Sequence, residues 1–346
     1  MRFPEFTERW DTYRIADILC IGNGRDYKHL SKGDIPVFGT GGYMTSVNEC
    51  LYEGETTFIG RKGTINKPFY YNGKFWTVDT LFYTHSFKRV IPKFVYCLFQ
   101  TINWLRYNEA SGVPSLSKDT IEKIKVRIPQ LDEQKKIAKL LSLLDERIAT
   151  QNKIIEDLKK LKSAISLNVL HSDTWEQFKI KDIAKIGRGR VISSIEISQQ
   201  KNPTYPVYSS QTSNNGIMGY LDDYMFEGEH ISWTTDGANA GTVFYRNGKF
   251  NCTNVCGLLK FRKEFDTYFV SLVLAEATKK YVSINLANPK LMNNTMGNIQ
   301  IRLPKLEEQK RISIVFRELQ KLWTVHNSLL TKYTKQKQYL LSQMFI

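Results

Sequence analysis

Apolar residues recur at alternating steps of four and three along two stretches of the chain that contain no glycine. The first series is Ile137, Leu141, Leu144, Ile148, Gln151, Ile155 and Leu158, and the second is Ile312, Phe316, Leu319, Trp323, His326, Leu330 and Tyr333. Each member of the second series lies 175 positions after its counterpart in the first. A heptad repeat of this kind predicts two long helices that pack along an apolar seam.

The two predicted helices span residues 130–172 and 305–346 and follow Pro129 and Pro304, which are typical of a helix entrance. A helix of about 40 residues reaches about 60 Å, which exceeds a small domain, so its apolar stripe needs a second long helix to cover it. Antiparallel pairing of the two helices is the simplest arrangement. In that arrangement Gln151 and His326 fall near the middle of the pair, where polar residues can fix register and orientation at a cost in stability.

The rest of the chain, residues 1–129 and 173–304, shows a different pattern. Short β-branched and aromatic runs, such as "TTFIG" from Thr56 and "HISWTT" from His230, alternate with turn-forming residues and predict strands. One longer apolar stretch in each part, residues 91–105 and 267–282, predicts a single helix. We therefore expect an α/β (α+β) fold class, with two mixed domains and two long helices.

The two mixed domains are near-copies of one another. "VRIPQLDEQKKI" from Val126 returns as "IRLPKLEEQKRI" from Ile301, and "WDTYRIADI" from Trp10 returns as "WEQFKIKDI" from Trp175. The motif "GNGR" at Gly22 returns as "GRGR", which favours a turn common to both copies over a nucleotide-binding loop. The separation drifts from 165 to 178 positions and settles at 175, as small loop insertions in a duplicated domain would produce.

Composition narrows the classes of function. The 49 Lys and Arg residues exceed the 34 Asp and Glu residues, which gives a net charge of +15 and a pI near 9.4. Such an excess favours a polyanionic partner, either nucleic acid or an anionic membrane surface. No apolar run approaches the roughly 18 residues that a membrane-spanning helix needs. The N-terminal segment also lacks the apolar core of a signal peptide. Five scattered cysteines, with no second Cys or His pair, favour reduced thiols, a cytoplasmic protein and no zinc site.

Catalytic motifs are missing from both copies. Neither "NGKF" segment has the upstream glycine and the hydroxyl residue of a phosphate-binding lysine loop. "NPTY" from Asn202 is one proline short of the N-P-P-[YF] pattern of DNA amino-methyltransferases. Each "EQK" opens a heptad helix, where early acidic residues complement the helix dipole. We therefore predict no catalytic residue, no metal site and no cofactor for this chain.

Polar, glycine-bearing loops supply the candidate binding residues. Arg and Lys can pair with guanine or phosphate, and Asn and Gln with adenine, although turns also select Gly, Asn, Asp and Ser for conformational reasons alone. The candidates in the first copy are Thr40, Gly42, Tyr43, Arg61, Lys62, Asn66, Lys67, Lys74 and Trp76. Those in the second copy are Ser209, Ser210, Gln211, Thr212, Asn214, Asn215, Thr234, Thr235, Asp236, Asn239, Arg246 and Lys249. Because the loops differ while the frames match, we expect two similar scaffolds that recognise two different short nucleic-acid sequences.

These features resemble the specificity (S) subunit of a type I DNA restriction–modification enzyme. The resemblance rests on "IPQLDEQKKIAKLLSLLDERI" and "LPKLEEQKRISIVFRELQKL", each of which follows a module that opens with "WDTYRIADI" or "WEQFKIKDI". It covers nearly the whole chain and implies two target recognition domains, residues 1–129 and 173–304, that each read half of a bipartite DNA site. It also implies that the helices at 130–172 and 305–346 form an antiparallel coiled-coil spacer and a docking surface for methyltransferase (M) subunits.

The resemblance assigns the chemistry to partner subunits. The M subunits associate with restriction (R) subunits, so S-adenosylmethionine, ATP and Mg are expected only on those partners. Two other functions stay open at this point: a self-contained DNA methyltransferase or nuclease with a degenerate motif, and a coiled-coil scaffold with no DNA role. A methyl-transfer assay on the purified chain, and its DNA affinity at moderate salt, would distinguish the three.

Overall fold

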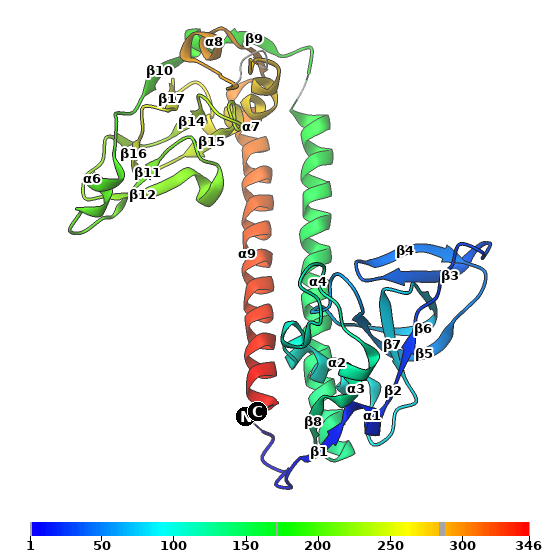
Figure 1. Ribbon diagram of the computed structural model, residues 1–346. Coiled ribbons are helices and arrows are strands. Elements are labelled where there is room, and N and C mark those ends of the chain that lie inside the picture. Colours follow the sequence, from blue (N-terminus) through cyan, green and yellow to red (C-terminus); the bar gives the residue numbers. More distant parts are fainter. Residues whose placement is uncertain (1, 171, 284–287, 346) are drawn as a thin grey trace. The chain divides into compact units, whose positions relative to one another are not determined.

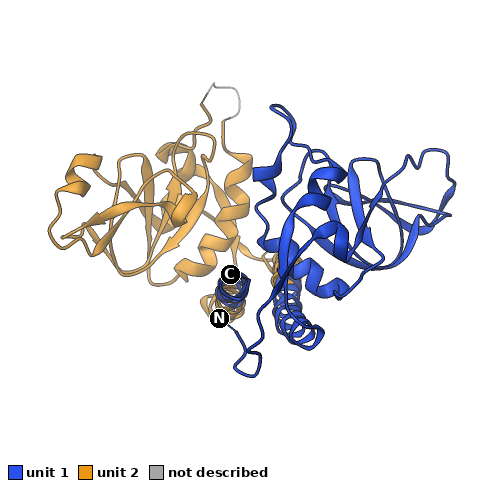
Figure 2. Cartoon of the chain, turned by 60° about the horizontal axis from the view of Figure 1, so that its bottom comes forward, with its two compact units in different colours: residues 1–154, 326–346 blue, residues 155–325 orange. Residues whose placement is uncertain are grey.

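The computed structural model describes residues 2–170, 172–283 and 288–345, and the chain divides into two compact units (Figure 1, Figure 2). Unit 1 comprises residues 1–154 and 326–346, and unit 2 comprises residues 155–325. Both boundaries fall inside the long helices α4 (Leu131–Val169) and α9 (Leu306–Met344). Each unit therefore contains one mixed domain and part of each long helix.

The mixed domain of unit 1, here called module 1, has a six-stranded and a two-stranded sheet. Its elements in chain order are β1 Asp11–Arg14, α1 Ile15–Ile18, β2 Cys20–Asn23, β3 Lys32–Gly39, β4 Gly42–Val47, β5 Tyr52–Gly60, β6 Phe69–Thr77, β7 Leu81–His85, α2 Pro92–Thr101, η1 Trp104–Tyr107, α3 Lys118–Lys123 and β8 Lys125–Ile128. The large sheet has the order β2-β7-β5-β6-β3-β4, in which only β3 and β6 are parallel, and β1 pairs with β8. Helix α2 buries Phe94, Val95 and Phe99 in the main core of this unit.

The mixed domain of unit 2, module 2, repeats this plan with two four-stranded sheets. Its elements are β9 Glu176–Lys179, α5 Ile180–Ile183, β10 Ala184–Arg188, α6 Ser194–Ser198, β11 Tyr205–Tyr208, η2 Ser213–Gly216, β12 Ile217–Leu221, β13 Phe226–Glu227, β14 His230–Thr234, β15 Val243–Arg246, β16 Lys249–Cys252, β17 Cys256–Phe261, α7 Thr267–Ala277, η3 Thr278–Lys280, α8 Asn293–Asn298 and β18 Gln300–Leu303. The sheets have the orders β10-β17-β14-β15 and β12-β11-β16-β13, and β18 pairs with β9. Helix α7 buries Phe269, Val270 and Leu274 against Trp233 in the core of unit 2.

The predicted α/β (α+β) class is confirmed, but two local predictions are wrong. Each module contains several short helices in addition to α2 or α7, and these one-turn helices are too short to show a 3.6-residue pattern. The shared "GNGR" and "GRGR" segments are not turns, because Gly22 lies in β2 and Gly187 lies in β10. The second glycine is needed for a close backbone approach: a Cβ on Gly24 would lie 1.9 Å from the Val78 carbonyl oxygen, and one on Gly189 would lie 1.5 Å from that of Cys252.

A buried glutamine explains why the motif before each long helix is repeated. Gln134 accepts a hydrogen bond from the Ile91 N–H at the entrance to α2 (3.0 Å) and donates one to the Pro129 carbonyl (2.8 Å). Gln309 repeats both bonds, with the Asp266 N–H before α7 (2.9 Å) and with the carbonyl two residues before α9 (2.8 Å). The amide therefore joins the first turn of each long helix to the main helix of its own module.

The two long helices contact each other and run antiparallel within unit 1. Lys337 Nζ lies 2.5 Å from Asp145 Oδ1, and His326 Nδ1 lies 2.7 Å from Gln151 Oε1. From Asp145 to Gln151 the residue number on α4 rises, while the number of the contacting residue on α9 falls from 337 to 326, so the two helices run in opposite directions. None of the helices in the described part of the chain combines the length and the apolar character that crossing a membrane requires.

Candidate nucleic-acid interface

Two candidate loops of module 1 lie next to each other. Thr40 lies in the tight connection between β3 and β4, and a Cβ on Gly63 would lie 3.7 Å from its Oγ1 atom. Gly63 belongs to the connection between β5 and β6, in which the side chains of Arg61 and Lys62 are exposed. Asn66 and Lys67 are exposed later in the same connection. The fold therefore brings a cationic loop beside the β3–β4 hairpin.

An exposed aromatic residue extends this edge. Tyr43, at the start of β4, is 64% exposed, and its hydroxyl oxygen lies 3.1 Å from Ser46 Oγ. Gly42 before it has φ +104, a backbone conformation that glycine adopts without the strain of a side chain. The hairpin therefore presents an aromatic face and a hydroxyl group, both of which can contact nucleic acid.

Two further candidates of module 1 lie elsewhere. Trp76 is only 5% exposed, donates its Nε1–H to the Arg25 carbonyl oxygen (3.0 Å) and packs with Val37, so we assign it to the core. Lys74 is exposed and lies opposite Glu53, 3.9 Å from its carboxylate. Lys74 lies five residues after the start of β6, so about 16 Å of strand separates it from the end of the cationic loop. Lys74 and Trp76 stand two residues apart and so lie on the same face of β6, but of the two only Trp76 joins a buried cluster, with Val37 and Val47.

Loop 209–216 of module 2 joins β11 to β12 and carries most of the candidates of that module. Thr212, Asn214 and Asn215 are exposed, whereas Ser209, Ser210 and Gln211 are half-buried. Asn214 and Asn215 have φ values of 48° and 54°, and Gly216 follows with 82°. Gln211 donates its Nε2–H to the Ile217 carbonyl oxygen (2.5 Å), so its amide also helps to close the loop. The loop therefore presents the polar side chains at its tip.

The second candidate loop of module 2 is held by its own hydroxyl groups. Thr234 and Thr235 are buried; the first donates to the Asn239 carbonyl oxygen and the second to that of Val255 (2.9 Å). We assign these two threonines to the fold, since buried hydroxyl groups that close a turn are not available to a ligand. Asp236 is half-buried and Asn239 is exposed, so these two keep an accessible position.

The two cationic candidates of module 2 have opposite environments. Lys249 is exposed, and its amine lies 4.4 Å from the centre of the Tyr224 ring, whose hydroxyl raises the pKa of Lys249. Arg246 is only 2% exposed, and burial lowers its pKa from the usual value. It donates from Nε to Ser232 Oγ and from Nη1 to the Asn215 carbonyl, each at 2.9 Å. Arg246 therefore cannot contact DNA directly in this conformation.

Sequence reasoning missed one segment in each module that flanks the candidate loops. Lys62 forms an isolated bridge with Ser115, and the Gly63 N–H donates to the Pro114 carbonyl (2.8 Å). In module 2 Asp236 forms the matching bridge with Lys290, whose side chain is exposed. The segments "SGVPS", with Gly and Pro, and "NPK", with Pro, were a usable signal, because both follow the main helix of their module.

None of the fourteen predicted seam residues on the long helices is exposed. The buried members are Ile137, Leu141, Leu144, Ile155, Ile312 and Phe316, and the half-buried members are Ile148, Gln151, Leu158, Leu319, Trp323, His326, Leu330 and Tyr333. The first two of each series, Ile137 with Leu141 and Ile312 with Phe316, join the core of a unit. The early seam positions thus pack on a mixed domain as well as along the helix pair.

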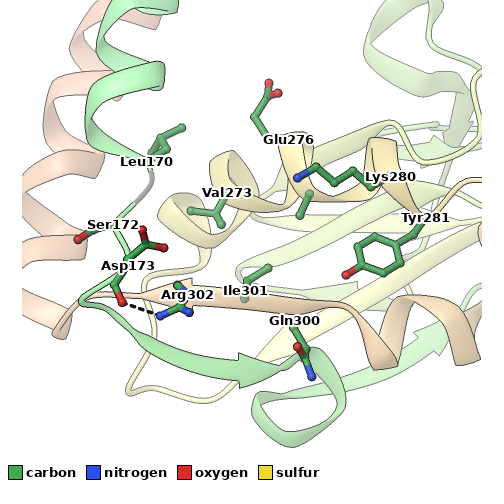
Figure 3. Close-up of a pocket in the computed structure, with 11 residues that line it drawn as sticks. Leu170, Ser172, Asp173, Val273, Glu276, Lys280, Tyr281, Gln300, Ile301 and Arg302 are labelled. Carbon is green, nitrogen blue, oxygen red and sulfur yellow. Dashed lines mark hydrogen bonds between the residues drawn. The ribbon is translucent and has the colours of Figure 1, made fainter.

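A cavity marks the place where the end of a long helix meets each module. In unit 2 it measures about 410 Å³ and is lined by Leu170, Val273 and Ile301, with Arg302 donating to the Asp173 carbonyl oxygen (2.6 Å) at its edge (Figure 3). Unit 1 has a cavity of about 360 Å³ lined at the corresponding positions, 175 residues away, by Phe345, Leu98, Val126 and Arg127. The end of α9 rests on module 1 as the end of α4 rests on module 2.

The described residues offer no grouping for a metal ion. Among them, no three His, Cys, Asp or Glu side chains are clustered as ligands would be. The cysteines are free thiols: Cys97, Cys252 and Cys256 are buried, and Cys20 and Cys50 are exposed. The chemistry of this surface is therefore that of hydrogen bonding, charge and aromatic contact.

Comparison with known proteins identifies the family. The family described as "Type I restriction modification DNA specificity domain" matches residues 7–160 and 172–332. A type I specificity subunit of Mycoplasma pneumoniae is 35% identical over 227 residues, which cover 62% of this chain and 82% of that protein. The specificity subunit of the type I restriction enzyme MpnII from the same organism is 43% identical over 150 residues, 43% of this chain and 44% of that protein.

The fold is also that of a solved specificity subunit. The crystal structure of the S subunit of a type I restriction–modification system from M. genitalium superposes with a TM-score of 0.81 and 15% identity, covering 100% of this chain and 99% of that chain. Three findings indicate the same family: the family domain matches twice, one relative is covered over most of its length, and the fold is shared. The chain belongs to the type I restriction–modification specificity family and is a non-catalytic DNA specificity subunit.

Proposed function

We propose that this chain reads a bipartite DNA target, with residues 1–129 and 173–304 as two target recognition domains for different half-sites. The observation that carries the proposal is the contrast between matched frames and unmatched loops. Module 1 exposes Arg61 and Lys62 beside the β3–β4 hairpin, whereas module 2 exposes Thr212, Asn214 and Asn215 at the tip of loop 209–216. Cationic and amide side chains prefer different base edges, so one frame can read two sequences.

Residues 130–172 and 305–346 are proposed as the spacer between the half-sites and as the docking surface for M subunits. Support comes from the apolar residues that α9 leaves exposed, among them Val315, Leu322 and Val325, since an exposed apolar face on a long helix is typical of a helix-binding partner. The R subunits would associate through the assembled complex. S-adenosylmethionine, ATP and Mg would bind to those partners, and the assembly would act on DNA in the cytoplasm.

The division of labour is tested by expressing the chain with and without a cognate M subunit. Alone, the chain should transfer no methyl group; with the M subunit it should direct adenine methylation to one sequence motif. Sequencing of methylated bases in the host genome reports the motif and its two halves. Methyl transfer by the purified chain alone would overturn the proposal.

The assignment of loops to half-sites is tested by paired substitutions. Arg61→Ala or Lys62→Ala should relax one half-site, and Gln211→Ala or Asn214→Ala the other, by about 1–3 kcal/mol for each lost base contact. Lys74→Ala is the matched control, because Lys74 is exposed but stands apart from the cationic loop. If all loop variants weakened binding to every DNA equally, the loops would contact phosphates and the assignment would be wrong.

The spacer role is tested by adding one heptad to each long helix near Gln151 and His326. Seven residues keep the apolar seam in phase and lengthen each helix by about 10 Å, which corresponds to roughly three base pairs. Those pairs also rotate one half-site by about a quarter turn, so we expect the same half-sites with a spacer longer by about one to three pairs, or lost activity. An unchanged spacer with full activity would show that the helices do not set the distance between the half-sites.

A further inference from the structure

Module 2 buries an arginine that the described residues do not pair with any carboxylate. Arg246, at the end of β15, makes no ion pair in the described part of the chain. Its guanidinium carbon lies 3.6 Å from the centre of the Tyr208 ring and 4.4 Å from that of Phe244. Two aromatic faces thus stabilise the cation in place of an acid. A buried arginine without an acid is uncommon and calls for a role.

The same guanidinium anchors loop 209–216 from below. Its Nη1 donates to the Asn215 carbonyl oxygen at 2.9 Å. Its Nη2 is buried without a hydrogen-bond partner and points at Gly216, since a Cβ built there would lie 2.9 Å from Nη2. The Asn215 carbonyl belongs to the left-handed run that turns the loop, so the position of Arg246 sets the direction of the exposed Asn214 and Asn215 side chains.

Strand register shows what stands at the same place in module 1. In module 1, Phe58 on β5 pairs with Phe69 on β6, and Tyr71 lies two residues after Phe69. In module 2, Ser232 on β14 pairs with Phe244 on β15, and Arg246 lies two residues after Phe244. Tyr71 and Phe58 are therefore the counterparts of Arg246 and Ser232. In module 1 both join an aromatic cluster with Phe38, Phe69 and Phe75. In module 2 the small serine leaves room for a guanidinium and accepts its hydrogen bond.

The difference between the loops accounts for the difference beneath them. In module 1 only residues 40 and 41 separate β3 from β4, and a turn that short is fixed by the two strands it joins. In module 2 eight residues, 209–216, separate β11 from β12. A longer loop has more conformations to lose, so it needs an internal contact to hold one of them.

We propose that Arg246 is a positioning residue for the second half-site: it does not touch DNA but fixes loop 209–216, and through the loop it sets the base preference of module 2. The inference rests on the proposed function, in which that loop reads DNA. The chemistry required of Arg246 is a planar fork that can stack on Tyr208 while it bonds Ser232 and Asn215.

The test removes the anchor while preserving the packing. Ser232→Phe with Arg246→Tyr gives module 2 the pair found in module 1, which fills the space but contributes no donor to the Asn215 carbonyl. Arg246→Lys keeps the charge and loses the fork. Tyr71→Phe is the matched control in module 1. Each full-length variant is expressed with the cognate M subunit, and the methylated motif is read from the host genome.

We expect the double variant and Arg246→Lys to lose discrimination at one or more positions of the second half-site by about tenfold or more, while the first half-site stays unchanged. Tyr71→Phe should change neither half. Thermal unfolding of each purified variant checks that it folds. If the core variants fail to fold, Ser232→Ala decides, because it removes the hydroxyl that accepts the hydrogen bond from Arg246 Nε and leaves the residues of the loop unchanged.

The outcomes separate the two proposals. A wild-type chain without a two-part motif would overturn the proposed function itself. A two-part motif that the folded variants read unchanged would overturn only the role of Arg246. Equal loss at both half-sites in folded variants would also overturn that role, since it would indicate a general structural effect.

Discussion

The two modules share a frame but differ in the small core beneath their loops. Module 1 fills this place with the aromatic side chains of Phe38, Phe58, Phe69, Tyr71 and Phe75. Module 2 has Tyr208, Ser232, Phe244, Arg246 and Phe250 at the matching positions. Module 2 has serine where module 1 has Phe58 and arginine where it has Tyr71, so a cation between aromatic rings stands in place of an aromatic cluster.

Contacts that belong to the frame, in contrast, are repeated. The Tyr70 hydroxyl donates to the Glu55 carboxylate in module 1, and the Tyr245 hydroxyl donates to the Glu229 carboxylate in module 2. The buried glutamine at the start of each long helix makes the same two hydrogen bonds in both units. The duplicated domain has thus kept the contacts that position its elements, and has changed the contacts that position its loops.

The largest effect is expected from a substitution that disrupts the aromatic cluster of module 1. Phe58→Ser should cost about 4 kcal/mol, because it removes a fully buried ring and leaves a cavity. Adding Tyr71→Arg should restore at least about 1 kcal/mol, since the guanidinium can fill the space and bond the new hydroxyl, as Arg246 does with Ser232. Urea unfolding of the two single variants and the double variant measures the coupling. Strictly additive costs would show that the two changes in module 2 are independent.

The second prediction compares the helix pair in the two units. Asp145→Asn should destabilise unit 1 by about 2–3 kcal/mol, because it leaves the Lys337 amine, whose side chain is 11% exposed, without its carboxylate. Lys337 also donates to Gln100 Oε1 (2.7 Å), which softens the loss. Gln320→Asn is the control at the matching position of unit 2 and should change little, since Gln320 is exposed. Hydrogen exchange along α9 locates the effect, and equal costs at both positions would contradict it.

The third prediction concerns the repeated glutamine. Gln134→Ala and Gln309→Ala should each cost about 2 kcal/mol, because each leaves a buried backbone N–H and a carbonyl unpaired. Gln134 should cost more, since its amide also donates to the Arg89 carbonyl (2.8 Å). Chemical unfolding measures the cost, and amide exchange at the entrance of α2 and α7 should rise. Variants that unfold like the wild type would show that the motif is repeated for another reason.

The smallest predicted effect is a pH dependence that module 1 lacks at the matching strand position. His230 is buried beside Phe226 and Phe250, and burial lowers its pKa; Thr56 is its counterpart. The unfolded imidazole, with a pKa of about 6.5, then binds protons more readily than the folded one, so stability is full above that pH and declines as the pH falls below it.

His230→Phe should remove that part of the decline while keeping the aromatic contacts. Urea midpoints of wild type and variant between pH 7.5 and about pH 5 measure it, a window set by the unfolded imidazole. His85 in module 1 is less buried, and burial lowers its pKa in the same direction, so His85→Phe is the comparison variant. Identical pH profiles for wild type and His230→Phe would contradict the prediction.

Several features of this protein follow from its sequence alone. Heptad spacing and the proline before each helix predicted two long helices, and α4 and α9 begin at Leu131 and Leu306, one residue inside the expected ranges. Short β-branched and aromatic runs between turn-forming residues predicted the strands, and the repeated motif before each helix pointed to the family. These are local properties, because a helix seam or a strand is specified by residues only a few positions apart in the sequence.

Only the tertiary structure decided which candidate side chains remain accessible. Trp76 and Arg246 look like ligands for nucleic acid in the sequence, but strand pairing turns both inward. The buried role of Gln134 could not be inferred either, since its partner Ile91 lies 43 positions away. The physical reason is register: a shift of one residue moves a side chain to the opposite face of a sheet, and register is fixed by contacts between segments far apart in the chain.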